Sequence, residues 1–306
     1  MRKIINLEEK GSGGIEYSIS KFPDGQQSLT IQDPESLIME KDDENEYGVN
    51  KYYPVRIYKR LRDFKDLEIL LCATAALKEI GVTDISVYIP YFIGARSDRK
   101  FTEGSFNYVK DVISPLINLQ GYTEVIVLDP HSDVIEACIK NFKKDTNIEF
   151  SKMCIKWICE QEGIGKEDIS IVSPDAGALK KIYDVAESNG INNVIVANKH
   201  RDIKTGKIVS TNVPLHLSYH DKAFVIFDDI CDGGRTFIEI AKVIKETFPE
   251  NKIFLCVTHG IFSNSFLELS KHFENVYSTN SYSDIDCSAH SDYTVDSKFL
   301  RQLEVI

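Results

Sequence analysis

The chain has 306 residues, which suits one large domain or two domains of about 150 residues each. Hydrophobic residues make up 42% and charged residues 27%, as in an ordinary globular protein, and no apolar run approaches the ~20 residues of a membrane-spanning helix. The net charge of -11 argues against nucleic-acid binding, so a polyphosphate ligand would need magnesium and local basic loops rather than a global field.

Cysteine usage indicates the compartment. The seven cysteines are odd in number and scattered, without a disulfide pairing pattern or zinc-ligand spacing. The first seven residues lack the apolar core of a signal peptide. We therefore expect reduced thiols, a cytoplasmic location and no membrane partner.

Strands and helices alternate along the chain, which is the pattern of a parallel sheet covered by helices on both faces. For the first half, the pattern predicts a helix at 66–80 that ends at Gly81, a strand at 85–89, a helix near 108–119, a strand at 125–128 and a helix at 134–142. The acidic stretch 41–46 is interpreted as a solvated loop.

The second half begins near Phe150 and continues the alternation, with helices between predicted strands at 169–172, 194–197, 224–227 and 253–257. We therefore predict an α/β fold with two domains, 1–149 and 150–306, each a mainly parallel sheet flanked by helices. The last residues are candidates for returning to the first domain. Strand, acidic turn and helix follow in the same order at 125–142 and 224–248, although the identity between these segments is too low to establish duplication.

The segment 225–237 is the most informative part of the sequence for predicting function. Its apolar strand is expected to break at Asp228 and Asp229, and a tight turn at 232–236 leads into an amphipathic helix. One face of that helix carries Phe237, Ile240, Ala241, Ile244 and Phe248. Strand, glycine turn and helix start form a cradle in which backbone N–H groups and the helix dipole point at a phosphate. The paired carboxylates suit ribose hydroxyls or a magnesium ion, and an ordinary turn with a solvated Asp pair is the alternative.

This segment resembles the loop with which ribose-phosphate pyrophosphokinases and phosphoribosyltransferases hold ribose 5-phosphate. The related kinases usually read Asp-Asp-x-x-Asp-Thr-Gly-Gly-Thr, whereas this chain reads Asp-Asp-Ile-Cys-Asp-Gly-Gly-Arg-Thr, so a hydroxyl is lost at Gly233 and a cation is gained at Arg235. The resemblance implies two domains of the type I phosphoribosyltransferase fold. It assigns ribose-phosphate binding to Asp228, Asp229, Asp232, Gly233, Gly234, Arg235 and Thr236.

Two segments resemble parts of the ATP site in the same kinases. Residues 90–100 follow a strand, at the end where open α/β sheets bind ligands, and resemble the family's Pro-Tyr-Phe-x-Tyr-Ala-Arg-Gln-Asp-Arg. ATP contacts are implied for Arg96, Ser97 and Asp98, with Ser97 in place of an adenine-facing Gln. Asp-Pro-His at 129–131 resembles the family's Asp-Leu-His, which assigns His131 to catalysis, ATP binding and metal binding. A solvated basic loop and a structural histidine are the plain alternatives.

Three further matches complete the ordered series. Ser-Pro-Asp-Ala-Gly at 173–177 resembles the family's Ser-Pro-Asp-x-Gly, so Asp175 is a predicted metal ligand, with a simple β-turn as the alternative. Lys199 and Arg201 match a Lys-x-Arg loop that closes over the triphosphate, where positive charge suits transfer chemistry at phosphorus. Phe22 and Asp24 match Phe-x-Asp-Gly-Glu, which reaches the adenine of a neighbouring subunit. This implies a homo-oligomer built from dimers, with a hexamer as one candidate, although a turn between strands also explains Pro-Asp-Gly.

The resemblance covers about residues 15 to 285 and implies magnesium-dependent transfer of the β,γ-diphosphoryl group of ATP to the anomeric hydroxyl of a ribose 5-phosphate, with release of AMP. No residue stands out as a general base. A glycine at 233 opens space and Arg235 suits a longer phosphate chain, so ADP-ribose, the acceptor of the ADP-ribose pyrophosphate synthetases of NAD salvage, competes with ribose 5-phosphate. A phosphoribosyltransferase and a silent regulatory paralogue are the other interpretations. The 90–100 segment and Lys199-x-Arg201 favour the kinase.

Overall fold

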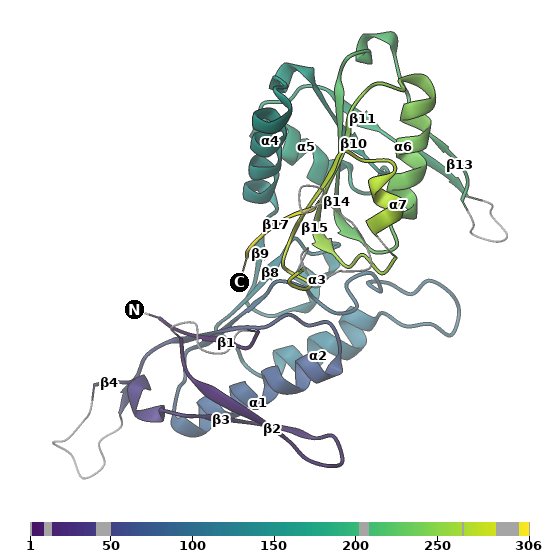
Figure 1. Ribbon diagram of the computed structural model, residues 1–306. Helices are drawn as coiled ribbons and strands as arrows, with labels where there is room; N and C mark the ends of the chain where they lie inside the picture. The colour runs from purple at the N-terminus through teal and green to yellow at the C-terminus, as the bar shows by residue number, and fades with distance from the viewer. Residues whose placement is uncertain are drawn as a thin grey trace. The chain divides into compact units, whose positions relative to one another are not determined.

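The computed structural model of the protein describes residues 2–8, 14–40, 50–201, 208–264, 266–285 and 300–305. The chain forms two compact units, residues 1–145 and 146–305 (Figure 1). The predicted solvated loop at 41–46 lies outside the described residues. Among the described helices, none is both long and apolar enough to cross a membrane. The roles predicted for the two halves of the chain stay predictions.

The first unit is built on a five-stranded parallel sheet. Its spatial order is β1 (Lys3–Asn6), β6 (Val55–Tyr58), β7 (Ile85–Ile89), β8 (Glu124–Leu128) and β9 (Phe142–Asp145). Because parallel strands run in one direction, their carboxyl ends meet at one edge, where the predicted ATP segments follow β7 and β8. Two short hairpins pair β2 (Tyr17–Lys21) with β3 (Gln27–Ile31) and β4 (Ile38–Glu40) with β5 (Lys51–Tyr52).

The first long helix, α1 (Phe64–Ile80), ends where predicted and begins two residues earlier than predicted. The Asp63 side chain accepts hydrogen bonds from the N–H groups of Lys65 and Asp66 at its start. The helix ends at Gly81, whose φ of 110° suits a residue without a Cβ. The helix predicted near 108–119 is a π-helical turn, η2 (Val109–Ile113), followed by α2 (Ser114–Asn118). A single 3-10 turn, η1 (Pro34–Leu37), precedes β4.

The helix predicted at 134–142 is wrong in its second half. α3 (Val134–Cys138) ends early, Ile139 is extended, and Asn141 takes a left-handed φ of 53°. Phe142 then begins β9 and pairs with Val125 of β8. The apolar spacing of 134–142 fits a helix, but backbone pairing with the neighbouring strand decides the local structure.

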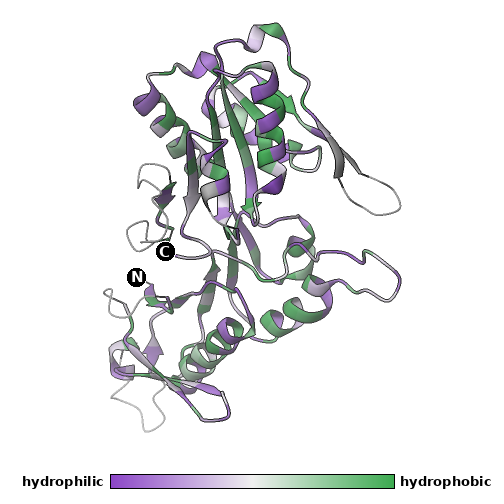
Figure 2. Ribbon diagram, turned by 45° about the vertical axis from the view of Figure 1, so that its right-hand side comes forward, coloured by the Kyte–Doolittle hydropathy of each residue, from purple (hydrophilic) through white to green (hydrophobic). Residues whose placement is uncertain are grey.

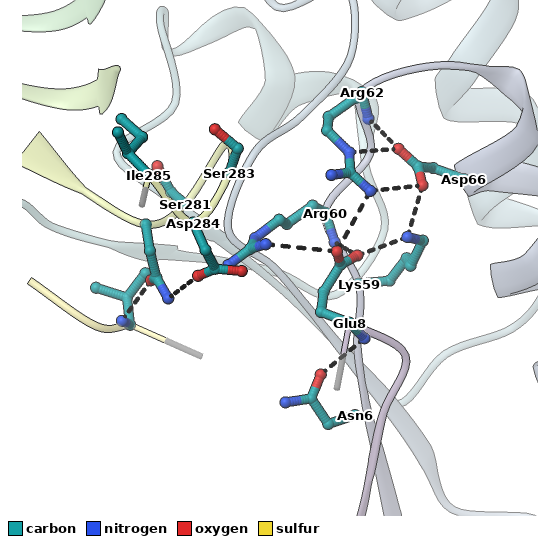
Figure 3. A network of polar contacts seen from close by, with 12 residues as sticks. Asn6, Glu8, Lys59, Arg60, Arg62, Asp66, Ser281, Ser283, Asp284 and Ile285 are labelled. Atoms are coloured by element: carbon teal, nitrogen blue, oxygen red, sulfur yellow. Dashed lines mark hydrogen bonds and ion pairs between the residues drawn. The ribbon is translucent and has the colours of Figure 1, made fainter. Parts of the chain in front are cut away.

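A network of ion pairs joins the ends of β1 and β6 to α1 (Figure 3). Lys59 Nζ lies 2.5 Å from Glu8 Oε1 and 2.6 Å from Asp66 Oδ1. Arg62 Nε donates to Asp66 Oδ2 at 2.9 Å. Burial alone would raise the pKa of Asp66, but hydrogen bonds from Arg62 and Lys59 lower it to about 2. The network therefore holds the start of α1 against the carboxyl edge of the first sheet.

The second unit contains a six-stranded parallel sheet. Its spatial order is β11 (Val194–Val196), β10 (Ile169–Ser173), β14 (Ala223–Cys231), β15 (Ile253–Gly260), β16 (Asn275–Thr279) and β17 (Leu300–Leu303). α4 (Ile148–Glu162) and α5 (Leu179–Asn189) cover one face, and α6 (Arg235–Thr247) and α7 (Phe266–Ser270) cover the other (Figure 1). The apolar central strands are green in Figure 2. The predicted α/β class, with mainly parallel sheets flanked by helices, is confirmed.

Both β14 and β15 run several residues further than predicted, to Cys231 and Gly260. β14 continues past Phe227 to Cys231, because Asp228 pairs with Val257 and Cys231 pairs with Gly260 of β15. The expected break of the strand at Asp228 and Asp229 is therefore wrong, since ladder hydrogen bonds use backbone groups and tolerate carboxylates at the carboxyl end.

The remaining elements connect these strands. β11 ends at Val196, one residue earlier than predicted, and the hairpin of β12 (Asn198–Arg201) and β13 (Ile208–Asn212) follows. The 3-10 turns η3 (Lys166–Asp168) and η4 (Leu217–Tyr219) lead into β10 and β14.

Candidate active site

The cradle predicted from the sequence lies at the end of β14. Asp229 is 6% exposed, Asp228 is half-buried, and the Asp229 N–H donates to Asp228 Oδ1 at 2.9 Å. Burial raises the pKa of Asp228 well above its ordinary value, and the charges of Asp229 and Asp175 raise it further. A bound cation or hydroxyl donors would stabilise carboxylates that lie so close together.

Glycine makes the turn from β14 into α6. Gly234 has a φ of 74°, and its carbonyl accepts a hydrogen bond from the Phe237 N–H at 3.0 Å. A Cβ at position 234 would lie 2.9 Å from Leu269 Cδ2, so packing and backbone conformation both disfavour a side chain there. The first N–H groups of α6 lack partners within the helix and suit an anion. The predicted glycine turn and helix start are present, and their ligand contacts stay predictions.

A segment that the sequence analysis missed, residues 261–264, lies against this turn. It follows β15, whose last residue pairs with Cys231. The N–H groups of Ile261 and Phe262 both donate to the Cys231 carbonyl, at 2.9 and 3.1 Å. Phe262 takes a left-handed φ of 50°, which is uncommon for a residue with a bulky side chain. The turn after β15 is thus bound to the end of β14 by backbone hydrogen bonds.

Side chains extend this pairing along the cradle. Ser263 Oγ donates to Asp232 Oδ1 at 2.5 Å, and Asn264 Nδ2 donates to the Gly233 carbonyl at 3.2 Å. A Cβ at position 233 would lie 2.7 Å from the same Asn264 nitrogen. The expectation that glycine at 233 opens space is therefore wrong, because the Asn264 amide occupies that side of the turn.

Asp175 lies at the same edge of the second sheet, after β10. Ser173 Oγ donates to the Asp175 carbonyl at 2.7 Å, and Asp175 Oδ1 accepts from the Ala178 N–H at 3.2 Å, just before α5. β10 and β14 are parallel neighbours, and the charge of Asp175 contributes to the raised pKa of Asp228. The structure therefore brings Asp175 and Asp228 together.

This arrangement fits a magnesium ion that is shared with a ligand. Among the described residues, no group of three or more His, Cys, Asp or Glu could hold a metal by itself. Magnesium commonly binds through one or two carboxylates and takes its other ligands from water and substrate phosphates. Asp175 and Asp228 supply carboxylates of that kind beside an anion cradle.

In the first unit, the segment after β7 is anchored by a buried carboxylate. Asp98 is 2% exposed, and its oxygens accept hydrogen bonds from Arg99, with Nε to Oδ1 at 2.9 Å. Burial alone would raise the pKa of Asp98, but Arg99, a hydrogen bond from Ser132 and the charge of His131 lower it. These contacts favour a positioning role for Asp98, whereas Arg96 is exposed.

His131 belongs to the same edge of the first sheet. It follows Asp129, which is buried and has a φ of 37°, and the Asp129 N–H donates to the Asp145 carbonyl at 2.7 Å. A left-handed backbone at a residue other than glycine is strained, and such strain is frequent at functional sites. His131 is exposed, and its charge acts on Asp98. Two predicted ATP-contacting segments therefore meet at this edge.

The remaining predicted residues lie on hairpins. Lys199 and Arg201 are on β12, where Lys199 pairs with Thr211 of β13, and their side chains lie outside the described part of the chain. Phe22 and Asp24 are in the turn between β2 and β3, where Asp24 Oδ1 accepts from the Gln26 N–H at 3.1 Å. Phe22 is 51% exposed, so its ring is available to another molecule.

Comparison with known proteins identifies relatives over most of the chain. No family model matches it. It is 28% identical to the ribose-phosphate pyrophosphokinase of Thermotoga maritima over 199 residues, 65% of this chain and 61% of that protein. It is 26% identical to that of Thermococcus kodakarensis over 266 residues, 86% of this chain and 84% of the relative. The chain is thus similar to ribose-phosphate pyrophosphokinases. The fold agrees with a crystal structure of phosphoribosylpyrophosphate synthetase from Mycobacterium smegmatis, with a TM-score of 0.76 and 18% identity over 99% of this chain and 94% of that one.

This similarity gives a context for the two groups of residues described above. The predicted cradle lies in the second unit with Asp175, and Asp98 and His131 lie together in the first. A signal for the missed 261–264 segment was present in the sequence, because it follows a buried parallel strand that neighbours the Asp228 strand.

Proposed function

We propose that this protein transfers the β,γ-diphosphoryl group of ATP to the anomeric hydroxyl of ribose 5-phosphate, giving AMP and a 1-diphosphate. The observation that carries the proposal is the cradle at 228–236: a strand with carboxylates near its end, a glycine turn and a helix start, in a chain related to ribose-phosphate pyrophosphokinases. The names of those relatives supply the substrates, and the cradle has the groups that such an acceptor needs.

In this proposal the second unit binds the acceptor. The N–H groups of Gly233, Gly234 and the first residues of α6 hold the phosphate, and the carboxylates of Asp228 and Asp229 accept from the ribose hydroxyls. Asp175 and Asp228 would hold magnesium, which neutralises charge on the phosphates when it is bound. Since the anomeric hydroxyl must attack phosphorus in line, orientation of the sugar is the main contribution of these groups.

The groups proposed for ATP come from three segments. Arg96 and Ser97 bind the nucleotide, and His131 contacts its phosphates. Lys199 and Arg201 neutralise charge that develops on the transferred group. Exposed Phe22, with Asp24, is proposed to reach a nucleotide bound to a second copy of the chain, which makes the protein an oligomer. The cytoplasmic location stays a prediction.

ADP-ribose is the second candidate acceptor, and one observation favours it. Arg235, the first residue of α6, is exposed and carries a charge that suits a second phosphate group. The filled volume beside Gly233 favours the smaller acceptor, so we rank ribose 5-phosphate first.

The experiment offers each acceptor separately to the purified full-length chain with ATP and magnesium and measures AMP by chromatography. AMP release that depends on ribose 5-phosphate supports the proposal. AMP release with ADP-ribose alone would show that ADP-ribose is the acceptor instead. No AMP with either acceptor contradicts the kinase and favours a transferase or a silent paralogue. The variant Lys199→Ala serves as the catalytic control and Lys180→Ala, an exposed lysine of α5, as the matched surface control.

A further inference from the structure

Asn264 and Gly233 fit together in the cradle. A Cβ at position 233 would lie 2.7 Å from Asn264 Nδ2, and this nitrogen donates to the Gly233 carbonyl at 3.2 Å. The amide therefore takes up the volume that a side chain at 233 would need. This pairing joins two turns that lie 31 residues apart in the sequence.

The segment that carries Asn264 is held in place by independent contacts. Ser263 Oγ donates to Asp232 Oδ1 at 2.5 Å. The N–H groups of Ile261 and Phe262 donate to the Cys231 carbonyl. Groups that are positioned before a ligand arrives bind it without a large ordering cost. The 261–264 segment is thus a second wall of the cradle.

We propose that Asn264 is a specificity-determining residue of the acceptor site, where its amide binds the phosphomonoester of ribose 5-phosphate in place of the side-chain hydroxyl that Gly233 lacks. The inference rests on the proposed function. An amide nitrogen carries two N–H donors, and the contact with Gly233 uses one of them. A phosphate dianion is a strong acceptor, and Asn264 is exposed, so a ligand can reach the amide.

The same geometry selects the size of the acceptor. Because the amide fills the volume beside Gly233, the cradle favours a terminal phosphate over the diphosphate linkage of ADP-ribose. Asn264 therefore has two effects, a hydrogen bond to the phosphate and a steric limit next to it. A substitution that removes both effects should weaken the binding of ribose 5-phosphate and reduce the discrimination against ADP-ribose.

The test uses binding of ribose 5-phosphate to the full-length chain by calorimetry, with magnesium and a non-hydrolysable ATP analogue present. Asn264→Gly should raise the Kd about 10- to 100-fold, the loss expected for one hydrogen bond to a charged group. Asn264→Asp keeps the shape, replaces the donors with a negative charge, and should weaken binding at least as much. Asn192→Gly, an exposed asparagine between α5 and β11, is the matched control and should leave the Kd unchanged.

The double variant Gly233→Thr/Asn264→Gly separates recognition from packing. Its threonine hydroxyl enters the vacated volume, so the Kd should return most of the way to that of the wild type. An unchanged Kd for Asn264→Gly overturns the inference while AMP release by the wild type still supports the proposed function. A double variant that binds no better than the single one also overturns it. A wild type that neither binds ribose 5-phosphate nor releases AMP overturns the proposed function and the inference together.

Discussion

The glycine turn of the cradle gives the most direct structural prediction. Gly234 has a φ of 74°, and a Cβ there would lie 2.9 Å from Leu269 Cδ2. Alanine at this position should lower the free energy of unfolding by about 1–2 kcal/mol through the left-handed backbone and by about 1–3 kcal/mol through overpacking. A smaller effect on the unfolded state, of about 0.4–1 kcal/mol, acts in the opposite direction. We therefore expect Gly234→Ala to lower the free energy of unfolding by about 2–4 kcal/mol.

A matched glycine isolates the packing contribution. Gly190 ends α5 with a φ of 68°, and a Cβ there would meet nothing within 4 Å. Gly190→Ala should thus lower the free energy of unfolding only through the backbone conformation, by about 1 kcal/mol. Urea unfolding followed by circular dichroism measures both variants. Equal free energies of unfolding for the two variants would refute the packing argument. Binding should separate them as well, because only Gly234→Ala disturbs the phosphate cradle.

Three further predictions concern catalysis, pH and packing. Lys199→Ala should lower the rate of AMP formation by at least about 100-fold without changing thermal unfolding, and near-normal turnover would remove Lys199 from the mechanism. The ion pairs lower the pKa of Asp66 to about 2, which adds about 2 kcal/mol to the free energy of unfolding above pH ~4, and this contribution is lost as the pH falls toward 2. Asp66→Asn should abolish this part of the acid dependence of unfolding. An unchanged profile would contradict the role of the ion pairs. Tyr122→Phe should cost about 1–2 kcal/mol, because the buried hydroxyl lies 2.7 Å from Thr74 Oγ1, whereas Tyr183→Phe at an exposed position should cost nothing measurable in the same urea titration.

The fold could be predicted where local signals agree. Gly81 marked the end of α1, and a short apolar run marked β7 from Ile85 to Ile89. The errors share one cause. β14 runs through Asp228 to Cys231, and 142–145 forms β9, because pairing with a neighbouring strand is a property of the sheet and leaves little trace in the local sequence.

The candidate site was predictable in part for the same reason. The carboxylates and glycines of the cradle all lie within residues 228–234, so one stretch of sequence displays the cradle. The contacts of Ser263 and Asn264 with Asp232 and Gly233 join turns 31 residues apart, and only the parallel pairing of β14 and β15 brings them together. The effect of the glycine at 233 can therefore be interpreted only when the position of the 261–264 segment is known.

In the proposed reaction a diphosphoryl group moves intact from ATP to the sugar, and phosphorus NMR of the products distinguishes this transfer from other routes. With ribose 5-phosphate as acceptor, we expect AMP and a C1-linked diphosphate in equal amounts. Formation of ADP, or of AMP with free pyrophosphate and unmodified ribose 5-phosphate, would contradict it.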